Sequence, residues 1–527
     1  MEAEKSPKRH IDQKEEEYPP RKLVFPAMAA LYLTVFLIAL DRTILGTAVP
    51  QITDEFNSFG DISWYEAGFL LPLCMLQLSF GLVYTFYSAK WILTALVIVF
   101  ETGSIVCATA PSSKALIVGR VITGIGGAGI TSGALILINI LVPLNSRPKY
   151  SGGIGAMFGL ASIIGPLVGG YLTAITWRWC FWINVPIGGV AVLVLIFLCP
   201  NRPPPAIAAP TLLGKVKQLD PIGFCLIAPA IVCLLFALQW GGQKYAWSDG
   251  RIIALFVVAG FLCLAFLTSQ VWQAGQGTIP SRITSQRTMI AASVASIGIG
   301  SIMVVYSFYI PVWFQAIQGK LPQSAGLSLL PLLLSQVVFV IFGGVATTVS
   351  GFYTPFLIIG GAISIIGSGL ITTWEVHTGA GKWISYQIVA GTGFGLTLQQ
   401  PNIAAQTVLS KSDAPIGLSI LTFLQFLGGT IFVTVCQTLL QTKLVQGLDG
   451  KVKLDASAIS NGGATTLRNE VSKDQLEFVL KVYNDSLTSV WYLTFGLSCL
   501  IFLASFGFEW KSVKKTEKKE EGQNVEV

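Results

Sequence analysis

The feature that most constrains this chain is a series of apolar runs, each long enough to cross a bilayer as a helix. A hydrocarbon core of about 30 Å requires about 20 consecutive apolar residues in helical form. Fourteen such runs follow one another along the 527 residues, and 12% of the residues are charged, about half the share of a soluble domain. The runs begin near Leu23, Trp64, Trp91, Ala115, Tyr150, Phe181, Ile222, Ile252, Met289, Ala325, Pro355, Ile384, Gly417 and Val490. The sequence therefore predicts an all-α polytopic membrane protein with fourteen spans.

The distribution of lysine and arginine predicts the orientation of these spans. Basic residues concentrate in the first 22 residues, in alternate loops and in the run from Lys511 to Lys519. Because positively charged loops stay on the cytoplasmic side, both termini are predicted to be cytoplasmic. The net charge of +7 then reflects membrane topology, and no nucleic-acid partner is expected. We expect a multi-pass plasma-membrane protein, with a vacuolar or other internal membrane as the alternative.

A faint internal duplication divides the chain. Gly81 is followed seven residues later by Ser88 after the second run, and Gly344 is followed seven residues later by Gly351 after the tenth. Duplicated halves are common in transporters. The predicted organisation is a disordered cytoplasmic tail (1–22), a six-helix half (23–200), a linker with two inserted spans (201–275), a second six-helix half (276–510) with a long outside loop at 443–487, and a charged cytoplasmic tail (511–527).

The residues that would support catalysis or metal binding are scarce. The nine cysteines are scattered without a CxxC pair, and the two histidines, His10 and His377, lie outside the apolar runs. We therefore expect no disulfide framework, no metal site and no cofactor. A membrane enzyme such as an acyltransferase would need a nucleophile with a general base, and an ATP-driven pump would need a GxxxxGK[ST] loop. Neither pattern occurs, so the protein is predicted not to be an enzyme.

Four charged side chains fall within the predicted spans or at their edges, where charge is costly unless it faces a cavity or a partner. At 1.5 Å per residue, Asp41 lies about 28 Å along the first span, with Arg42 next to it. Arg120 lies roughly 9 Å into a span that begins outside, at a depth similar to that of Asp41. Glu101 is central in its run. We predict that Asp41, Arg42, Glu101 and Arg120 take part in proton coupling, because an arginine beside a carboxylate controls its protonation.

A purely structural interpretation of the same residues stays open. Asp41 and Arg42 would then belong to a packing salt bridge at the outer rim of the bundle. Glu101 would be a neutral side chain that is hydrogen-bonded to a neighbouring helix.

Two glycine-rich runs predict close helix packing. Gly124 to Gly129 spells GxGxxG, but no Asp or Glu occurs between Gly129 and Asp220, so the ribose-binding acid of a dinucleotide site is missing. Small residues that let helices approach one another explain this run better. In the second run a proline kink accompanies the glycines, which suits helices that rock between two packings. The predicted conformational motif consists of Gly124, Gly165, Pro166, Gly169 and Gly170.

Candidate substrate contacts are aromatic and amide side chains in the second half. Tyr309 and Trp313 recur at helical spacing with Gln315 beyond them, although such a stripe is more often core or lipid-facing. The amides of Gln399, Gln400, Asn402 and Gln425 are better candidates, because amides within spans need partners. Aromatic rings with a few amides would bind amphipathic molecules loosely.

The predicted outside loop contains the sequon Asn484-Asp485-Ser486, which makes Asn484 a candidate for glycosylation. Sequons that are never modified are also common, and this one is close to the bilayer. Both interpretations stay open.

These motifs together resemble the major facilitator superfamily, and within it the fourteen-span drug:proton antiporter branch of filamentous fungi, which includes exporters of toxins and secondary metabolites. The resemblance covers nearly the whole chain. It rests on Asp41-Arg42-Thr43, on Arg120 with Gly124, on Gly165-Pro166 with Gly169-Gly170, and on the segment from Trp177 to Gly188. It implies two six-helix halves plus two extra central helices, and it associates Arg120 with proton transfer. Thr85 departs from the pattern, because the superfamily usually has an aspartate there.

The predicted function is therefore efflux of small amphipathic molecules, such as a toxin, a secondary metabolite or a drug, in exchange for protons by alternating access. The expected partners are a small-molecule substrate, protons and the lipid bilayer, and the protein is expected to be a monomer. A major-facilitator importer of a nutrient or an iron chelate is one alternative. A membrane receptor that binds a ligand without transporting it is another.

Overall fold

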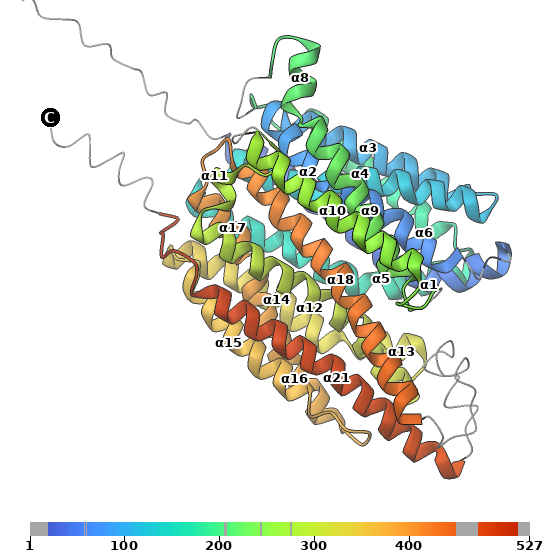
Figure 1. Cartoon of the computed structure of the whole chain (residues 1–527). Helices are drawn as coiled ribbons and strands as arrows, with labels where there is room; N and C mark the ends of the chain where they lie inside the picture. The colour runs from blue at the N-terminus through green and yellow to red at the C-terminus, as the bar shows by residue number, and fades with distance from the viewer. Residues whose placement is uncertain are drawn as a thin grey trace, which may run out of the picture.

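The computed structural model describes residues 19–56, 58, 61–204, 208–242, 245–273, 277–448 and 473–514. The chain forms a bundle of long helices that run roughly along one axis (Figure 1). The helices of the first half are α1 (Arg21–Phe56), α2 (Ile62–Phe86), α3 (Ala89–Ala108), α4 (Ser113–Leu141), α5 (Arg147–Ile175), α6 (Trp179–Trp182) and α7 (Asn184–Phe197). A short helix α8 (Leu212–Gln218) precedes α9 (Pro221–Trp240) and α10 (Gly250–Trp272). The second half contains α11 (Ser281–Thr284), α12 (Arg287–Ala316), α13 (Pro322–Leu327), α14 (Leu330–Ser350), α15 (Thr354–Ile371), α16 (Ala380–Leu398), α17 (Gln400–Val408), α18 (Ala414–Leu448) and α21 (Lys473–Ser505).

Within the described residues, thirteen helical segments are long and apolar enough to cross a membrane. They correspond to thirteen of the fourteen predicted runs. The remaining run, expected from Ile384, lies in α16, which packs against α14 and α15. Lys382, Tyr386 and Gln387 lower the apolar character of α16. The polytopic all-α prediction is confirmed, and the number fourteen stays a prediction.

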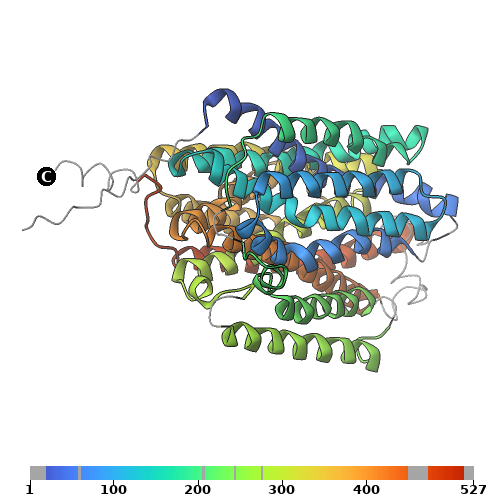
Figure 2. The ribbon, with the colours of Figure 1, turned by 90° about the horizontal axis from the view of Figure 1, so that it is seen from above.

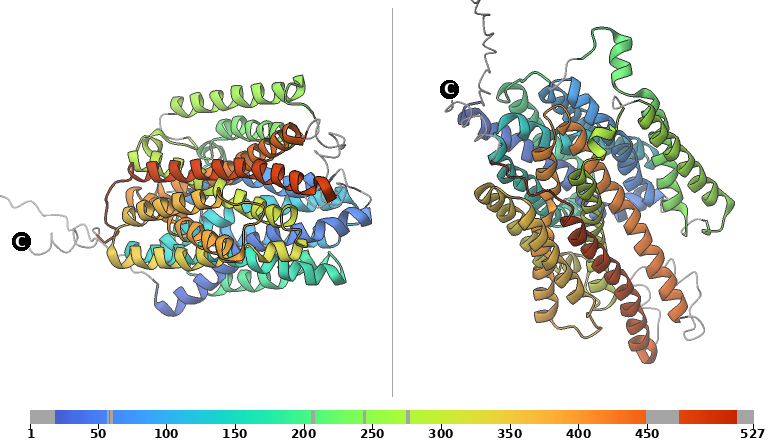
Figure 3. Two further views of the ribbon diagram at one scale, coloured as in Figure 1. Left: turned by 90° about the horizontal axis from the view of Figure 1, so that it is seen from below. Right: turned by 60° about the vertical axis from the view of Figure 1, so that its left-hand side comes forward.

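Two pairs of helices join the halves. In the first half α1 packs on α5, and α2 and α3 pack on α4; in the second half α12 packs on α18 and α21, and α14 and α15 pack on α16. Across the interface α5 packs on α14 and α2 packs on α18. Figure 3 shows the two sets of helices from two further sides. The site described below depends on this arrangement, because it decides which helix faces meet.

Glycine lets the two halves touch through their backbones near the ends of these helices that are predicted to be cytoplasmic. A Cβ atom at Gly344 of α14 would lie 2.5 Å from the carbonyl oxygen of Pro148 and 3.4 Å from Cα of Gly152, both on α5. A Cβ atom at Gly81 of α2 would lie 2.9 Å from Cβ of Ser419 on α18. The structure is therefore tightly packed between the halves on the predicted cytoplasmic side.

The inserted pair α9 and α10 lies side by side at one margin of the bundle, where α9 contacts α2 (Figure 2). Asp220, in the left-handed conformation with φ 48°, caps α9 by accepting a hydrogen bond from Gly223 N at 2.8 Å. Its carboxylate also accepts hydrogen bonds from Gln270 and Gln273 at the end of α10 and from the backbone and hydroxyl of Thr278. Burial by itself would raise the pKa of Asp220, but these donors outweigh burial and lower it. One carboxylate thus ties the adjacent ends of α9 and α10 together.

Helices extend into both ends of the segment 443–487, which the sequence predicts to be an outside loop. α18 continues to Leu448 and α21 begins at Lys473, and both helices project past their neighbours in Figure 1. With 35 and 33 residues, each helix is about 50 Å long, well beyond the roughly 30 Å hydrocarbon core. Polar residues in this region therefore do not mark where the helices end. The rest of the predicted loop lies outside the described residues.

Candidate functional site

The centre of the candidate site is a buried ion pair between two helices of the first half. Asp41 on α1 and Arg120 on α4 are each 0% exposed. A guanidinium nitrogen (Nη1) of Arg120 donates a hydrogen bond to Oδ2 of Asp41. The structure therefore brings together two residues that the sequence predicts to lie at similar depths.

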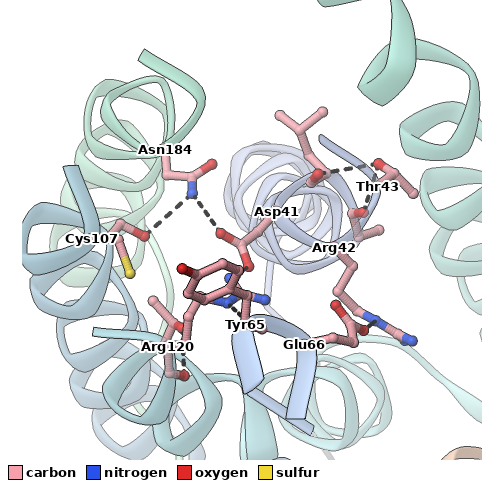
Figure 4. A network of polar contacts seen from close by, with 12 residues as sticks. Asp41, Arg42, Thr43, Tyr65, Glu66, Cys107, Arg120 and Asn184 are labelled. Carbon is pink, nitrogen blue, oxygen red and sulfur yellow. Dashed lines mark hydrogen bonds and ion pairs between the residues drawn. The ribbon is translucent and has the colours of Figure 1, made fainter. Parts of the chain in front are cut away.

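Neighbouring helices complete the surroundings of the pair. Nε of Arg120 donates to the carbonyl oxygen of Tyr65 at 2.9 Å, and the guanidinium lies 4.8 Å from the centre of the Phe69 ring. The amide of Asn184 on α7 donates to Oδ1 of Asp41 at 3.3 Å and to the hydroxyl of Ser104 on α3 at 3.3 Å. Figure 4 shows Asp41 between Asn184 on one side and Arg120 with Tyr65 on the other. Such a shell is needed because removing two charges from water is costly unless other hydrogen bonds compensate.

Glu101 lies beside this network without joining it. It is 9% exposed, and neither carboxyl oxygen has a hydrogen-bond partner in the described part of the chain. Its carboxyl group occupies the space above Gly188 of α7, where a Cβ atom would overlap it. Its carboxyl group also interacts electrostatically with that of Asp41. An unpaired buried carboxylate is costly unless it is protonated or hydrated, so this position suits a group that binds a proton.

Arg42 turns away from the buried pair, as the 100° step between adjacent helical residues predicts. Its Nε is 3.7 Å from Oε1 of Glu66 on α2, and both side chains are partly exposed. The guanidinium also lies 5.9 Å from the centre of the Phe426 ring on α18. Arg42 therefore lies at the interface of the two halves, outside the network of Asp41.

The predicted conformational motif packs mainly on the helix that carries Asp41. Cβ atoms at Gly165 and Gly169 of α5 would overlap the hydroxyl groups of Thr43 and Thr47 on α1. Thr43 also donates to the carbonyl oxygen of Ala161 at 3.0 Å. Pro166 lies inside α5 and Gly170 is partly buried. Gly124 of α4 packs against the Phe69 backbone of α2. The same α5 faces α14 through Gly152, Gly155 and Gly159, so one helix contacts both the Asp41 helix and the second half.

The two predicted aromatic substrate contacts, Tyr309 and Trp313, form hydrogen bonds within the second half. The hydroxyl of Tyr309 donates to the carbonyl oxygen of Val433 at 3.1 Å. The indole of Trp313 donates to Asn484 at 2.8 Å and packs against Trp374. Gln315, two residues further on, is partly buried. These contacts give Tyr309 and Trp313 a packing role in this structure.

The predicted amide contacts occupy two different places. Gln399, Gln400 and Asn402 are buried where α16 meets α17, and Nε2 of Gln399 would be 3.1 Å from a Cβ at Gly155 of α5. Asn402 donates to Gln399 at 3.1 Å, and Gln400 accepts from Thr347 at 3.3 Å. Gln425 lies on α18 next to Phe426, and its Nε2 has no hydrogen-bond partner among the described residues. Gln399 therefore lies near the contact of α5 with α14, whereas Gln425 lies on α18, which packs on α2.

Asn484 is placed in the middle of a helix and not in a loop. It is 6% exposed, its Oδ1 accepts from Trp313 at 2.8 Å and its Nδ2 donates to the carbonyl oxygen of Trp374 at 2.9 Å. A glycan would be attached to that same nitrogen. The structure thus gives Asn484 a structural role that disfavours glycosylation of the folded protein.

Asn184, Gly188, Ser104 and Tyr65 belong to the site but were not singled out in the sequence. Asn184 carried a signal, because an amide inside an apolar run needs a partner. The roles of Gly188 and of the Tyr65 carbonyl depend on which helix faces meet, so no sequence pattern indicates them.

Comparison with known proteins finds similarity over most of the chain. A family model described as Major Facilitator Superfamily matches residues 31–433. The MFS-type transporter VdtG of Byssochlamys spectabilis is 44% identical over 500 residues, which cover 94% of this chain and 90% of VdtG. The efflux pump aflT of Aspergillus parasiticus is 42% identical over 489 residues, covering 92% and 95%. The rubrofusarin-specific efflux pump aurT of Gibberella zeae is 41% identical over 505 residues, covering 95% and 92%.

Solved structures share the fold at low sequence identity. The proton:xylose symporter XylE has a TM-score of 0.58 at 13% identity, covering 94% of this chain and 99% of XylE. The human organic anion transporter MFSD10 has a TM-score of 0.57 at 13% identity, covering 91% and 100%. The family match and the fungal relatives establish that this chain belongs to the Major Facilitator Superfamily and is a membrane transporter, not an enzyme.

Proposed function

We propose that this transporter exports small amphipathic molecules, such as a fungal secondary metabolite, a toxin or a drug, in exchange for protons. The direction of transport is supported by the relatives, several of which are named efflux pumps. Coupling to protons is supported above all by one observation: the Asp41–Arg120 ion pair lies in a span, and Glu101 is unpaired beside it. Ionised groups in a membrane interior are costly and serve mainly along substrate or proton pathways.

Protonation of Asp41 would change the balance of forces in the first half. The ionised carboxylate holds Arg120 by charge and Asn184 by a hydrogen bond. Once Asp41 is neutral, the buried guanidinium loses its counter-ion and must move toward another acceptor. Glu101 is such an acceptor in its ionised form, and it is the second proton-binding group of this proposal.

The packing of α5 gives a route by which this local change reaches the second half. Gly165 and Gly169 fix α5 against the helix of Asp41, and Gly152 fixes α5 against α14. A shift of α1 would therefore tilt α5 and loosen its contact with α14. Substrate would enter from the cytoplasm between the halves when they separate there, and it would leave on the outer side after they close again.

The proposed substrate contacts lie at the interface of the halves. Phe426 on α18 faces Arg42, which pairs with Glu66, and the Nε2 atom of its neighbour Gln425 has no hydrogen-bond partner among the described residues. An aromatic ring, an unsatisfied amide and a partly exposed ion pair form a surface that suits amphipathic molecules. Gln399 and Asn402 would contact substrate closer to the cytoplasm, whereas Tyr309 and Trp313 would support the pocket from behind.

Transport in vesicles with an imposed pH gradient tests the proposal. The wild-type protein should move a fluorescent amphipathic drug against its gradient while protons move the opposite way. Asp41→Asn and Arg120→Ala should abolish uphill transport at equal membrane abundance. Glu55→Gln is the matched control, because it removes a partly exposed carboxylate from the same helix, where Glu55 pairs with Arg178 at 2.9 Å.

Other outcomes would point to the alternatives. Uptake in the direction of the proton gradient would identify an importer, and saturable binding without flux would identify a receptor. Full uphill export by both Asp41→Asn and Arg120→Ala would remove the proton-coupling role of the ion pair.

A further inference from the structure

A chain of hydrogen-bonded side chains connects the outer ends of α2 and α4, and the mechanism above makes no use of it. The hydroxyl of Tyr65 donates to the hydroxyl of Ser113 at 3.0 Å, and Ser113 donates to Oδ2 of Asp61 at 2.5 Å. The hydroxyl of Ser58 lies 2.7 Å from that of Tyr65. Asp61 precedes α2 and is partly exposed, whereas Tyr65 is 0% exposed. The chain therefore runs from a carboxylate at the predicted outer surface to a fully buried phenol.

Tyr65 belongs to this chain and to the surroundings of the ion pair at the same time. Its backbone carbonyl accepts the hydrogen bond from Nε of Arg120. Its ring packs in the apolar cluster with Ile44, Leu45 and Ala48 of α1, which begins one turn beyond Asp41 on the outer side. Figure 4 shows the Tyr65 ring next to Asp41 and Arg120. Tyr65 thus lies between the buried pair and the outer ends of the helices, among apolar side chains.

Building on the proposed proton exchange, we propose that Asp61, Ser113 and Tyr65 form the route by which protons reach Asp41 from the outer side. Hydroxyl groups suit this task because each can accept one hydrogen bond while it donates another. A surface carboxylate at the head of the route collects protons from water. The buried ion pair at its end is the acceptor.

The transfer balances at every step. Asp61 takes a proton from outer water and donates it to Oγ of Ser113, while Ser113 passes its own proton to the hydroxyl oxygen of Tyr65. The original phenolic proton of Tyr65 then moves to Asp41 through intervening water, because the described contact of Tyr65 with the ion pair is made by its backbone carbonyl. Asp61 ends as a carboxylate, both hydroxyls end neutral, and Asp41 carries the proton and releases Arg120. In the structure Tyr65 donates to Ser113 and Ser113 donates to Asp61. This is the arrangement that remains after a proton has passed inward and Asp61 is ionised again.

The other charged groups near these helix ends have different positions. Glu66 faces Arg42 at 3.7 Å, and Glu55 pairs with Arg178 at 2.9 Å. Lys114 follows Ser113 and is exposed to solvent. On the inner side of the route, Arg120 and Glu101 are the charged groups around Asp41. Among the described residues, Asp61 is thus the carboxylate that contacts the hydroxyl chain directly.

Two transport modes separate a proton route from a structural tie between α2 and α4. Uphill efflux driven by an outward-acid pH gradient requires a proton to enter in every cycle. Exchange of labelled for unlabelled substrate at equal pH on both sides requires the same helix movements without net proton transfer. Tyr65→Phe keeps the ring and removes only the hydroxyl, and Ser113→Ala and Asp61→Asn interrupt the route at its other positions. Tyr171→Phe is the control, because Tyr171 on α5 is 72% exposed.

We expect Tyr65→Phe and Ser113→Ala to slow proton-driven efflux by roughly tenfold, less than the ~10²-fold of a positioned proton-transfer group, because water can replace a hydroxyl. Asp61→Asn should require a more acidic outer solution for the same rate. Substrate exchange at equal pH should stay within about twofold of wild type in these variants, as it should in Tyr171→Phe. Proton-driven efflux at the wild-type rate in Tyr65→Phe, or equal losses in both modes, would overturn the route. A wild-type protein without pH-driven efflux would instead refute the proposed function itself.

Discussion

Replacement of Gly344 by alanine should force the cytoplasmic ends of the two halves apart. The added Cβ atom would lie 2.5 Å from the carbonyl oxygen of Pro148, whereas ordinary contact begins at 3.4 Å. The helices α5 and α14 must therefore separate by about 0.9 Å, because a backbone atom cannot rotate away as a side chain can. In a state that is open to the cytoplasm the two helices are apart, and the methyl group costs nothing there.

The magnitude follows from the cost of overpacking. A methyl group forced into close-packed surroundings typically destabilises them by about 1–3 kcal/mol. Because this penalty applies only to the cytoplasm-closed state, the ratio of open to closed molecules should rise by about 5- to 150-fold. Gly260→Ala is the matched control, since Gly260 also lies within a span, on α10, and a Cβ there would meet no described atom within 4 Å.

A cysteine introduced at Ser151 measures this ratio. Ser151 is 0% exposed and precedes Gly152 on α5, so a thiol there should react only when the halves separate. The exposed native cysteines, Cys225 and Cys263, are replaced by alanine, and inside-out vesicles are treated with a membrane-impermeant maleimide. Gly344→Ala should raise the labelling rate and Gly260→Ala should leave it unchanged. Labelling of the Gly344→Ala protein at or below the parent rate would refute the role of this contact.

Two further predictions concern the buried polar groups. Gly188→Ala should displace the Glu101 carboxyl group and lower proton-driven efflux severalfold at unchanged abundance, whereas Gly189→Ala, where a Cβ would have no described neighbour within 4 Å, should transport like wild type; equal activities would show that the position of Glu101 is unimportant. Asn484→Ala should destabilise the protein by about 1–3 kcal/mol, because the indole of Trp313 and the carbonyl of Trp374 lose their partner. A lowered melting temperature in detergent, together with no electrophoretic shift of the wild type after endoglycosidase treatment, would agree with this, and a shift that depends on Asn484 would contradict it.

The ends of the long helices illustrate where sequence patterns were insufficient. Apolar runs located the spans because hydrophobicity over about 20 residues is a local property. The same measure placed a loop at 443–487, whereas α18 continues to Leu448 and α21 already begins at Lys473. Polarity ends a span but does not end a helix, since a helix in water tolerates polar side chains on every face.

Asp41 and Arg120 illustrate what could be predicted about the site. Charge inside an apolar run stands out in any sequence, and counting the rise per residue placed both side chains at similar depth. Tyr309 and Trp313 were equally visible, but their spacing did not distinguish a pocket from the core. The structure gives each a hydrogen-bond partner on another helix.

The sequence by itself therefore determined that this protein is a many-span membrane bundle and which of its charged groups are costly to bury. The tertiary structure decided the partners: Asn184 on Asp41, the Tyr65 carbonyl on Arg120, and Gly188 under Glu101. The physical reason is that lipid and protein core are both apolar, so the pattern of a membrane helix does not reveal which face turns inward. That rotation is fixed only when the helices pack together and each buried polar group finds the partner it needs.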